Sequence, residues 1–311
     1  MLKNIIKLSF TNFKEVWKLL LYRFVYFLFV LGLTTVASYN IIVTLIKENF
    51  FVNLQTNFKD LAFNLDITKI FNAINLTFKD FSNIVYSNQL VVQSILCLIC
   101  VIFVISFFEV LSRVSLHNNA NGYMNSMVQF GFANSYVSNF GKSVLYWLVY
   151  IITELPITLA ILAGAYLFAS KLSVVLGFWS VLLAVVIIIV CFAIKKMIFG
   201  GWIPSLIING KKVFRSFIYG LKANFKNFIK VFLIYLFFES LGVLLTIFSL
   251  TLTFGVGLFI VMPLWTLEEI LVAQVAYYES YGMRYYVDSE EIITPKRLEQ
   301  QDKFAKVKDI I

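Results

Sequence analysis

Four acidic residues lie inside long apolar stretches of this sequence: Glu154, Glu239, Glu268 and Glu269. A carboxylate at lipid depth is costly, so acids in membrane spans usually face protein or water. Along a helix, Glu239 lies about 14 Å beyond Lys230 and Glu154 about 18 Å beyond Lys142. The sequence shows no Lys or Arg at comparable depth. Two interpretations follow: protonated carboxyls that hydrogen-bond between helices, or a shared polar site for a proton, a cation or a basic group.

Other residues whose side chains could be reactive are better explained by structural roles. Glu109 precedes Arg113 by four residues, the favourable order for an ion pair within a helix. Cys97 and Cys100 form a C-x-x-C in an apolar run without a second ligand pair, which favours small buried side chains over a metal or redox site. The sequence has no Walker-type loop, zinc-protease motif or nucleophile elbow. It therefore predicts no metal, no cofactor and no enzymatic activity.

The composition sets the class of protein. Hydrophobic residues make up 60% of the 311 positions and charged residues 14%, against about half and about a quarter in globular domains. The net charge is +9, but the basic residues flank apolar runs, which is typical of membrane topology and not of nucleic-acid binding. We therefore expect an all-α polytopic membrane protein with no nucleic-acid partner.

Six stretches are apolar and long enough to cross a bilayer core of about 30 Å as helices. They lie near 20–46, 90–114, 143–169, 174–198, 229–253 and 256–279. Before the tail, fifteen Lys and Arg residues fall on the side of the N-terminus and five on the other, which predicts that both termini are cytoplasmic. We expect one membrane domain over 1–286 and a mixed-charge cytoplasmic tail over 287–311.

Three segments outside the spans are also expected to lie at the membrane surface. The outer segment 47–90 has apolar residues at helical spacing and reads as two amphipathic helices. The segment 118–141 carries no Asp, Glu, Lys or Arg and is either an interfacial helix or a re-entrant piece. The segment 205–228 is basic and amphipathic, and it is the strongest candidate for a binding surface.

This basic segment combines two sets of side chains. Its basic residues are Lys211, Lys212, Arg215, Lys222 and Lys226. Its expected apolar stripe is Leu206, Val213, Phe217, Leu221, Phe225 and Phe228. Such a helix is typical of contact with an anionic inner leaflet. Docking of a membrane or cytoplasmic protein partner is the alternative.

A local pattern recurs before the first, third and fifth spans: Asn12-Phe13, Asn139-Phe140 and Asn224-Phe225. Each pair is followed by Lys and a long apolar run. Glu154 and Glu239 both fall fifteen residues after the Asn of their units. We therefore predict three helical hairpins, each entered from an interfacial segment, with a candidate site where the repeats meet.

Two motifs in the last third of the chain resemble a known group. They are the run from Arg215-Ser216-Phe217 to Asn224-Phe225, and the ending Pro263, Tyr277-Tyr278-Glu279 and Arg284. Both are similar to a loose group of bacterial six-helix membrane proteins of undefined role, whose module is also fused to glycerophosphodiester phosphodiesterases. The resemblance implies an inner-membrane protein of bacterial type that is an accessory to lipid or envelope processes. Together with the absence of catalytic motifs, it predicts a non-enzymatic accessory or scaffold protein. The alternative is a small transporter or transporter subunit that uses the intramembrane glutamates.

Overall fold

The computed structural model describes residues 1–59, 66–128, 130–210, 212–289 and 291–294. Apart from two short strands, the regular elements of the described residues are helices. The first half contains α1 (Leu2–Thr11), α2 (Lys14–Ala37), α3 (Tyr39–Lys47), α4 (Phe50–Lys59), α5 (Ile67–Ser87), α6 (Val91–Ser126) and α7 (Phe132–Ser138). The second contains α8 (Phe140–Ile152), α9 (Glu154–Leu176), α10 (Phe178–Phe199), α11 (Trp202–Ile208), α12 (Val213–Lys226), α13 (Phe228–Leu252) and α14 (Leu258–Tyr281).

Six helical stretches are long and apolar enough to cross a membrane, which confirms the predicted fold class. They are Lys14–Ala37, Val91–Ser126, Phe140–Leu176, Phe178–Ile208, Phe228–Leu252 and Leu258–Tyr281. Several predicted boundaries were wrong. The first span begins earlier and is interrupted near Ser38, and the second continues past its predicted end at residue 114 to Ser126. The uncharged segment 118–141 is therefore shared between the end of α6 and the short α7.

The predicted interfacial entry recurs three times as a short helix, an asparagine break and a longer helix. Asn12 ends α1 before α2, Asn139 ends α7 before α8, and Asn227 ends α12 before α13. The third break was predicted at Asn224-Phe225, but α12 continues through that pair and breaks at Asn227-Phe228. Asn224 does not interrupt the helix because its side chain is fully buried and donates to the carbonyl of Met197 at 2.8 Å.

The chain divides into two compact units, and the boundaries fall within or at the ends of long helices. Unit 1 comprises Met1–Arg23, Glu109–Glu154 and the described part of Ile189–Ile311. Unit 2 comprises the described part of Phe24–Phe108 and all of Leu155–Ile188. Each unit has its own packing and is described separately.

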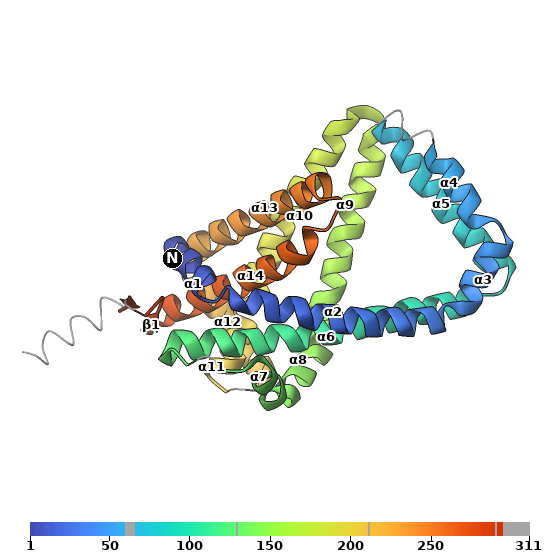
Figure 1. Ribbon diagram of the computed structural model, residues 1–311. Coiled ribbons are helices and arrows are strands. Elements are labelled where there is room, and N and C mark those ends of the chain that lie inside the picture. Colours follow the sequence, from blue (N-terminus) through green and yellow to red (C-terminus); the bar gives the residue numbers. More distant parts are fainter. Residues whose placement is uncertain (60–65, 129, 211, 290, 295–311) are drawn as a thin grey trace, which may run out of the picture. The chain divides into compact units, whose positions relative to one another are not determined.

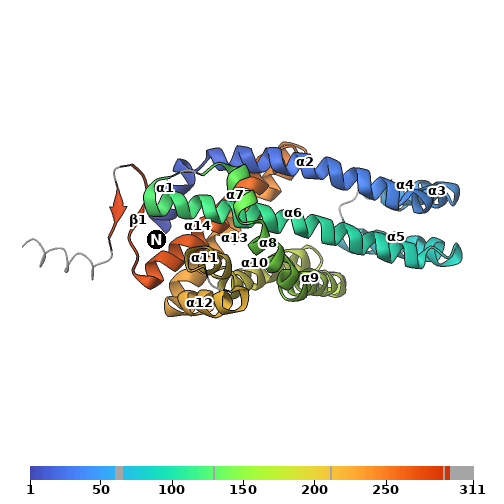
Figure 2. The ribbon, with the colours of Figure 1, turned by 90° about the horizontal axis from the view of Figure 1, so that it is seen from below.

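Unit 1 is organised around α14, whose second half is almost entirely buried. The neighbouring α13 runs alongside it (Figures 1 and 2), and α1, α11 and α12 also pack against it. Small residues allow the close approaches. A Cβ on Gly242 would lie 2.3 Å from the ring of Trp265, and one on Gly220 would lie 2.3 Å from the backbone of Gly201. Close packing of this kind is a main source of helix association where lipid surrounds the helices.

Unit 2 includes the two predicted outer amphipathic helices, α4 and α5, which lie side by side (Figures 1 and 2). Residues 61 and 65 of the predicted apolar pattern lie outside the described residues. A small core of Ile41, Leu45 and Phe50 joins α3 and α4 to Phe81 of α5. In the same unit, the Tyr166 hydroxyl of α9 donates to Asn75 of α5 at 2.8 Å.

The start of the predicted tail is ordered on unit 1. Strand β1 (Tyr285–Tyr286) pairs antiparallel with β2 (Ile292–Ile293). Val287 between them is fully buried, and its carbonyl accepts a hydrogen bond from Thr11 of α1 at 3.1 Å. The first residues of the predicted tail therefore pack against unit 1.

Candidate functional site

Lys196, near the end of α10, is the centre of a buried ion-pair cluster in unit 1. Its ammonium group lies 2.5 Å from Oε1 of Glu269 on α14 and also donates to Oε1 of Glu239 on α13. The second oxygen of Glu269 lies 3.4 Å from the Arg113 guanidinium on α6. Four helices are thus joined through alternating charges.

Glu154 has a separate set of partners. Its Oε1 accepts a hydrogen bond of 2.5 Å from the Tyr146 hydroxyl of α8, and its Oε2 lies 3.9 Å from Lys195 of α10. A break at Thr153 places Glu154 at the first position of α9. Pro156 follows in the first turn, where proline is tolerated because the first amide hydrogens of a helix have no partner within it. The break thus allows Tyr146 and Glu154 to meet although they lie on different helices.

A further ion pair joins α2 to α6. The Arg23 guanidinium donates to Glu109 at 2.9 Å and to the Thr266 hydroxyl of α14 at 2.9 Å. Glu109 and Arg113, which were predicted to pair with each other, also form ion pairs with residues of other helices. Four carboxylates of the apolar stretches now face four basic groups: Arg23, Arg113, Lys195 and Lys196.

The expectation that no cation lies at the depth of the glutamates was wrong. Lys195 and Lys196 were counted as cytoplasmic charges at the end of the fourth span, but helix packing in unit 1 places both amines beside acids of other helices. Of the four predicted acids, Glu239 and Glu269 share one lysine, and Glu154 pairs with the adjacent one. Glu268 is half-buried and has no ion-pair partner among the described residues.

Aromatic side chains complete the surroundings of Lys196. The ring of Trp265 lies 5.3 Å from its ammonium group, within the range of a cation–π contact. Tyr235, one turn before Glu239, is 2% exposed and its hydroxyl has no hydrogen-bond partner in the described structure. Sequence reasoning missed the basic members and Trp265. The adjacent lysines at the end of a span were the one signal that pointed to them.

The predicted basic segment 205–228 consists of two helices, α11 and α12, and not one. The buried side of α12, which packs against the rest of unit 1, carries small or polar residues: Ser216, Gly220, Ala223 and Asn224. The expected apolar stripe is divided: Leu206 is buried and Val213 and Phe217 pack against a core of unit 1, whereas Phe225 and Phe228 are exposed. Instead, the apolar residues at positions 214, 218, 221 and 225 form a separate face, on which Phe214, Ile218 and Phe225 are exposed.

The basic residues of α12 flank this apolar face. Lys212, Arg215 and Lys222 are exposed. Lys226 is also exposed, but its amine donates to the carbonyl of Ser280 at 2.7 Å. Lys211, which was predicted as part of the patch, lies outside the described residues. The arrangement gives α12 a buried side, an apolar side and a basic side.

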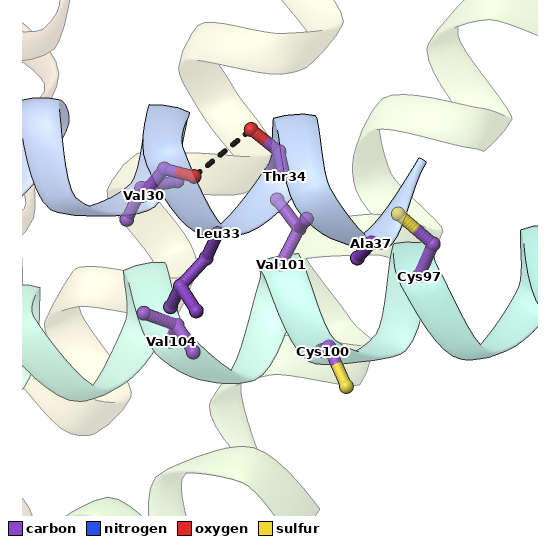
Figure 3. Close-up of a pocket in the computed structure, with 8 residues that line it drawn as sticks. All are labelled: Val30, Leu33, Thr34, Ala37, Cys97, Cys100, Val101 and Val104. Carbon is purple, nitrogen blue, oxygen red and sulfur yellow. Dashed lines mark hydrogen bonds between the residues drawn. The ribbon is translucent and has the colours of Figure 1, made fainter. Parts of the chain in front are cut away.

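A groove of about 290 Å³ lies between α2 and α6 in unit 2 (Figure 3). It is lined by Val30, Leu33, Thr34, Ala37, Cys97, Cys100, Val101 and Val104. The Thr34 hydroxyl donates to the carbonyl of Val30 at 2.9 Å within its own helix, as Figure 3 shows. The groove is therefore apolar, and Cys97 and Cys100 are free thiols in it.

Comparisons with known proteins yield no matching family model, no matching curated protein and no matching solved structure. The function of this polytopic helical membrane protein is therefore inferred from the ion-pair cluster and from the three-sided helix α12.

Proposed function

We propose that this chain is a non-enzymatic accessory or scaffold protein of a bacterial inner membrane, with both termini in the cytoplasm. The resemblance of its last third to bacterial six-helix membrane proteins agrees with a role in lipid or envelope processes. The proposal depends on one observation: each of Glu154, Glu239 and Glu269 is matched by a basic side chain from another helix. Acids neutralised in this way hold helices together and leave little free charge for a transported ion.

The exposed sides of α12 supply the binding surface of this scaffold. An apolar face flanked by exposed lysine and arginine fits the boundary between headgroups and acyl chains of an anionic leaflet. Each basic residue near such a surface contributes about 1 kcal/mol. We therefore assign lipid contact to Phe214, Ile218 and Phe225, and phosphate contact to Arg215 and Lys222.

The test compares a variant of the basic side of α12 with a variant of the intramembrane acids, all purified in the same way. The variant Lys212→Gln/Arg215→Gln/Lys222→Gln should retain less anionic phospholipid through purification, as measured by native mass spectrometry. Glu268→Gln should retain as much as the unmodified chain, because that carboxyl is remote from the basic face in sequence and helix. Equal retention in all three proteins would reject the assignment of lipid binding to α12.

A transporter that uses the glutamates is the second candidate. It is favoured by the sharing of Lys196 between two carboxylates and by Glu268, which has no ion-pair partner in the described part of the chain. Purified protein in liposomes loaded with a pH-sensitive dye separates the two functions. Proton or cation flux that is lost in Glu239→Gln and Glu268→Gln would show that the chain is a transporter and would reject the scaffold function. Absence of flux supports the scaffold function.

A further inference from the structure

The three asparagine breaks share more than backbone geometry. Two residues before each asparagine lies an exposed apolar side chain, and directly after it lies an exposed phenylalanine. The preceding residues are Phe10, Val137 and Phe225, which are 50–78% exposed. The following ones are Phe13, Phe140 and Phe228, which are 39–46% exposed. Exposure of the same positions in three separate places indicates a common environment.

A lysine completes each break. Lys14 follows its asparagine by two residues, and Lys142 and Lys230 follow theirs by three. All three are exposed. Lys230 also pairs with Glu279 at 2.7 Å while remaining half-exposed. Aromatic rings beside lysines are the side chains enriched where a membrane protein crosses the lipid–water interface.

From each break, an exposed apolar stripe continues along the longer helix. It consists of Trp17 and Leu21 on α2, Leu145 and Leu148 on α8, and Leu233 and Phe237 on α13. Each stripe runs past an ion-paired residue in the sequence: Arg23, Glu154 or Glu239. Exposed apolar side chains continue beyond that residue in each case. The stretches between the breaks and the charged residues are apolar and exposed. The hydrocarbon of a lipid bilayer is therefore the environment that suits them.

We propose that the three breaks together mark one boundary of the bilayer, with the phenylalanines in the headgroup region and the lysines on anionic phosphates. Arg23 then lies about 17 Å, Glu239 about 18 Å and Glu154 at most about 22 Å along the helices from their breaks. A hydrocarbon core is about 30 Å thick, so the ion-pair cluster lies near the middle of the membrane. This inference depends on membrane insertion alone and not on the accessory role proposed above.

The alternative is that the bilayer boundary lies at the level of Arg23, Glu154 and Glu239, because charged residues usually mark the ends of membrane spans. The lengths of α13 and α14 argue against it. Beyond Glu239, α13 has only thirteen residues, which reach about 20 Å. Before Glu269, α14 has eleven, which reach about 17 Å. Neither helix would then cross the core, whereas both cross it if the boundary lies at the breaks.

Depth-dependent fluorescence quenching tests this placement on the full chain. The three native cysteines, Cys97, Cys100 and Cys191, are replaced by alanine. Single cysteines are then introduced as Phe13→Cys, Phe140→Cys and Phe228→Cys and labelled with an environment-sensitive fluorophore. Matched deep positions are Leu21→Cys, Leu148→Cys and Phe237→Cys, which are exposed and lie about 12–14 Å further along the same helices.

In vesicles of phosphatidylcholine and phosphatidylglycerol, lipids that carry a quencher on the headgroup should quench the first set more strongly. Lipids with the quencher deep in the acyl chain should quench the second set more strongly. Quenching of the first set by aqueous iodide, with headgroup quenching moved to the second, would place the boundary at the charges and overturn the proposal. Different depths among the three break positions would also overturn it.

The lysines provide a second and independent measurement. Replacing Lys14, Lys142 or Lys230 by glutamine should weaken retention of phosphatidylglycerol by about fivefold per residue. Lys171→Gln is the matched control, because that lysine is exposed but lies in unit 2, away in sequence from any break. Equal losses in the control and the break variants would show that the lysines bind no phosphate at the breaks.

Discussion

Unit 1 contains all the salt bridges found among the described residues, whereas no ion pair joins the described residues of unit 2. The hydrophobic core of unit 1 is also larger than that of unit 2. Two clusters of buried residues lie in unit 1, and the cluster in unit 2 has only Ile41, Leu45 and Phe50 as fully buried members. The helices of unit 1 are thus joined by specific contacts, and those of unit 2 mainly present apolar side chains outward.

The comparison shows where sequence changes should matter. Apolar side chains gain little from leaving lipid for a protein interior, so hydrophobicity alone does not fix helix positions in a membrane. Close packing and polar pairs do, and both are concentrated in unit 1. Substitutions of the same chemical type should therefore have larger effects in unit 1 than in unit 2.

The largest difference is expected for a lysine. Lys196→Met leaves Glu239 and Glu269 with one cation fewer, and removal of one partner of a buried pair typically costs about 3–5 kcal/mol. Lys171→Met in unit 2 should change nothing measurable, because Lys171 is exposed. The free energy of unfolding in bicelles, measured by steric trapping, compares the two variants.

A double variant shows whether charge balance is the cause. Lys196→Met/Glu239→Gln removes one charge of each sign and leaves Glu269 paired with Arg113. It should recover more than half of the stability lost in Lys196→Met. Equal loss in the single and double variants would mean that Lys196 acts through its packing against Trp265 and not through its charge.

A smaller effect is expected for glycine. In Gly220→Ala the new methyl group would meet the backbone of Gly201 at 2.3 Å, so α11 and α12 must separate, at a cost of about 1–3 kcal/mol. In Gly164→Ala of unit 2 nothing lies within 4 Å of the new atom. That variant should be neutral or slightly more stable, because alanine favours helix. The free energy of unfolding of the two variants is compared by the same steric-trapping measurement. Equal destabilisation by both variants would contradict the expectation that unit 1 is more sensitive to substitution than unit 2.

A tyrosine pair sharpens the comparison further. Tyr146→Phe removes a buried hydrogen bond to Glu154, and hydrogen bonds between membrane helices are worth about 1 kcal/mol. Tyr166→Phe in unit 2 removes an exposed hydrogen bond to Asn75 and should cost less. A larger loss for Tyr166→Phe would show that the outer helices are held more firmly than their exposure suggests.

Much of the fold followed from the sequence because its signals are local. Apolar length predicted the six spans, and helical spacing predicted α4 and α5 in the outer segment. The asparagine before a span predicted the interfacial entries. The third entry was placed three residues too early because two Asn-Phe pairs stand in succession, and only tertiary contact shows that Asn224 is held by Met197 within α12.

The ion-pair cluster was only half visible in the sequence. The acids stand out in apolar runs, but their basic partners lie on other helices. Lys195 and Lys196 looked like topology signals because a lysine at the end of a span usually faces the headgroups. That these lysines meet Glu154, Glu239 and Glu269 is a property of packing between helices, which spacing along one helix does not encode.

The smallest effect is expected for an exposed ion pair in the same unit as the buried ones. Lys7 of α1 donates to Glu291 and lies 3.6 Å from Asp288. Hydrogen bonding to Glu291 raises the pKa of the Lys7 amine. A raised amine pKa stabilises the fold fully below the ordinary lysine value of about 10.4, and the contribution is lost only as the pH rises through the raised value.

Lys7→Gln should therefore lower the unfolding midpoint only slightly at neutral pH, because solvent screens exposed pairs. The midpoint of the unmodified chain should fall towards that of the variant only in alkaline buffer. A clear loss at neutral pH would show that the contact between α1 and the β1–β2 hairpin contributes to stability as strongly as the buried pairs. Charge pairing, and not burial of that pairing, would then be what distinguishes unit 1 from unit 2.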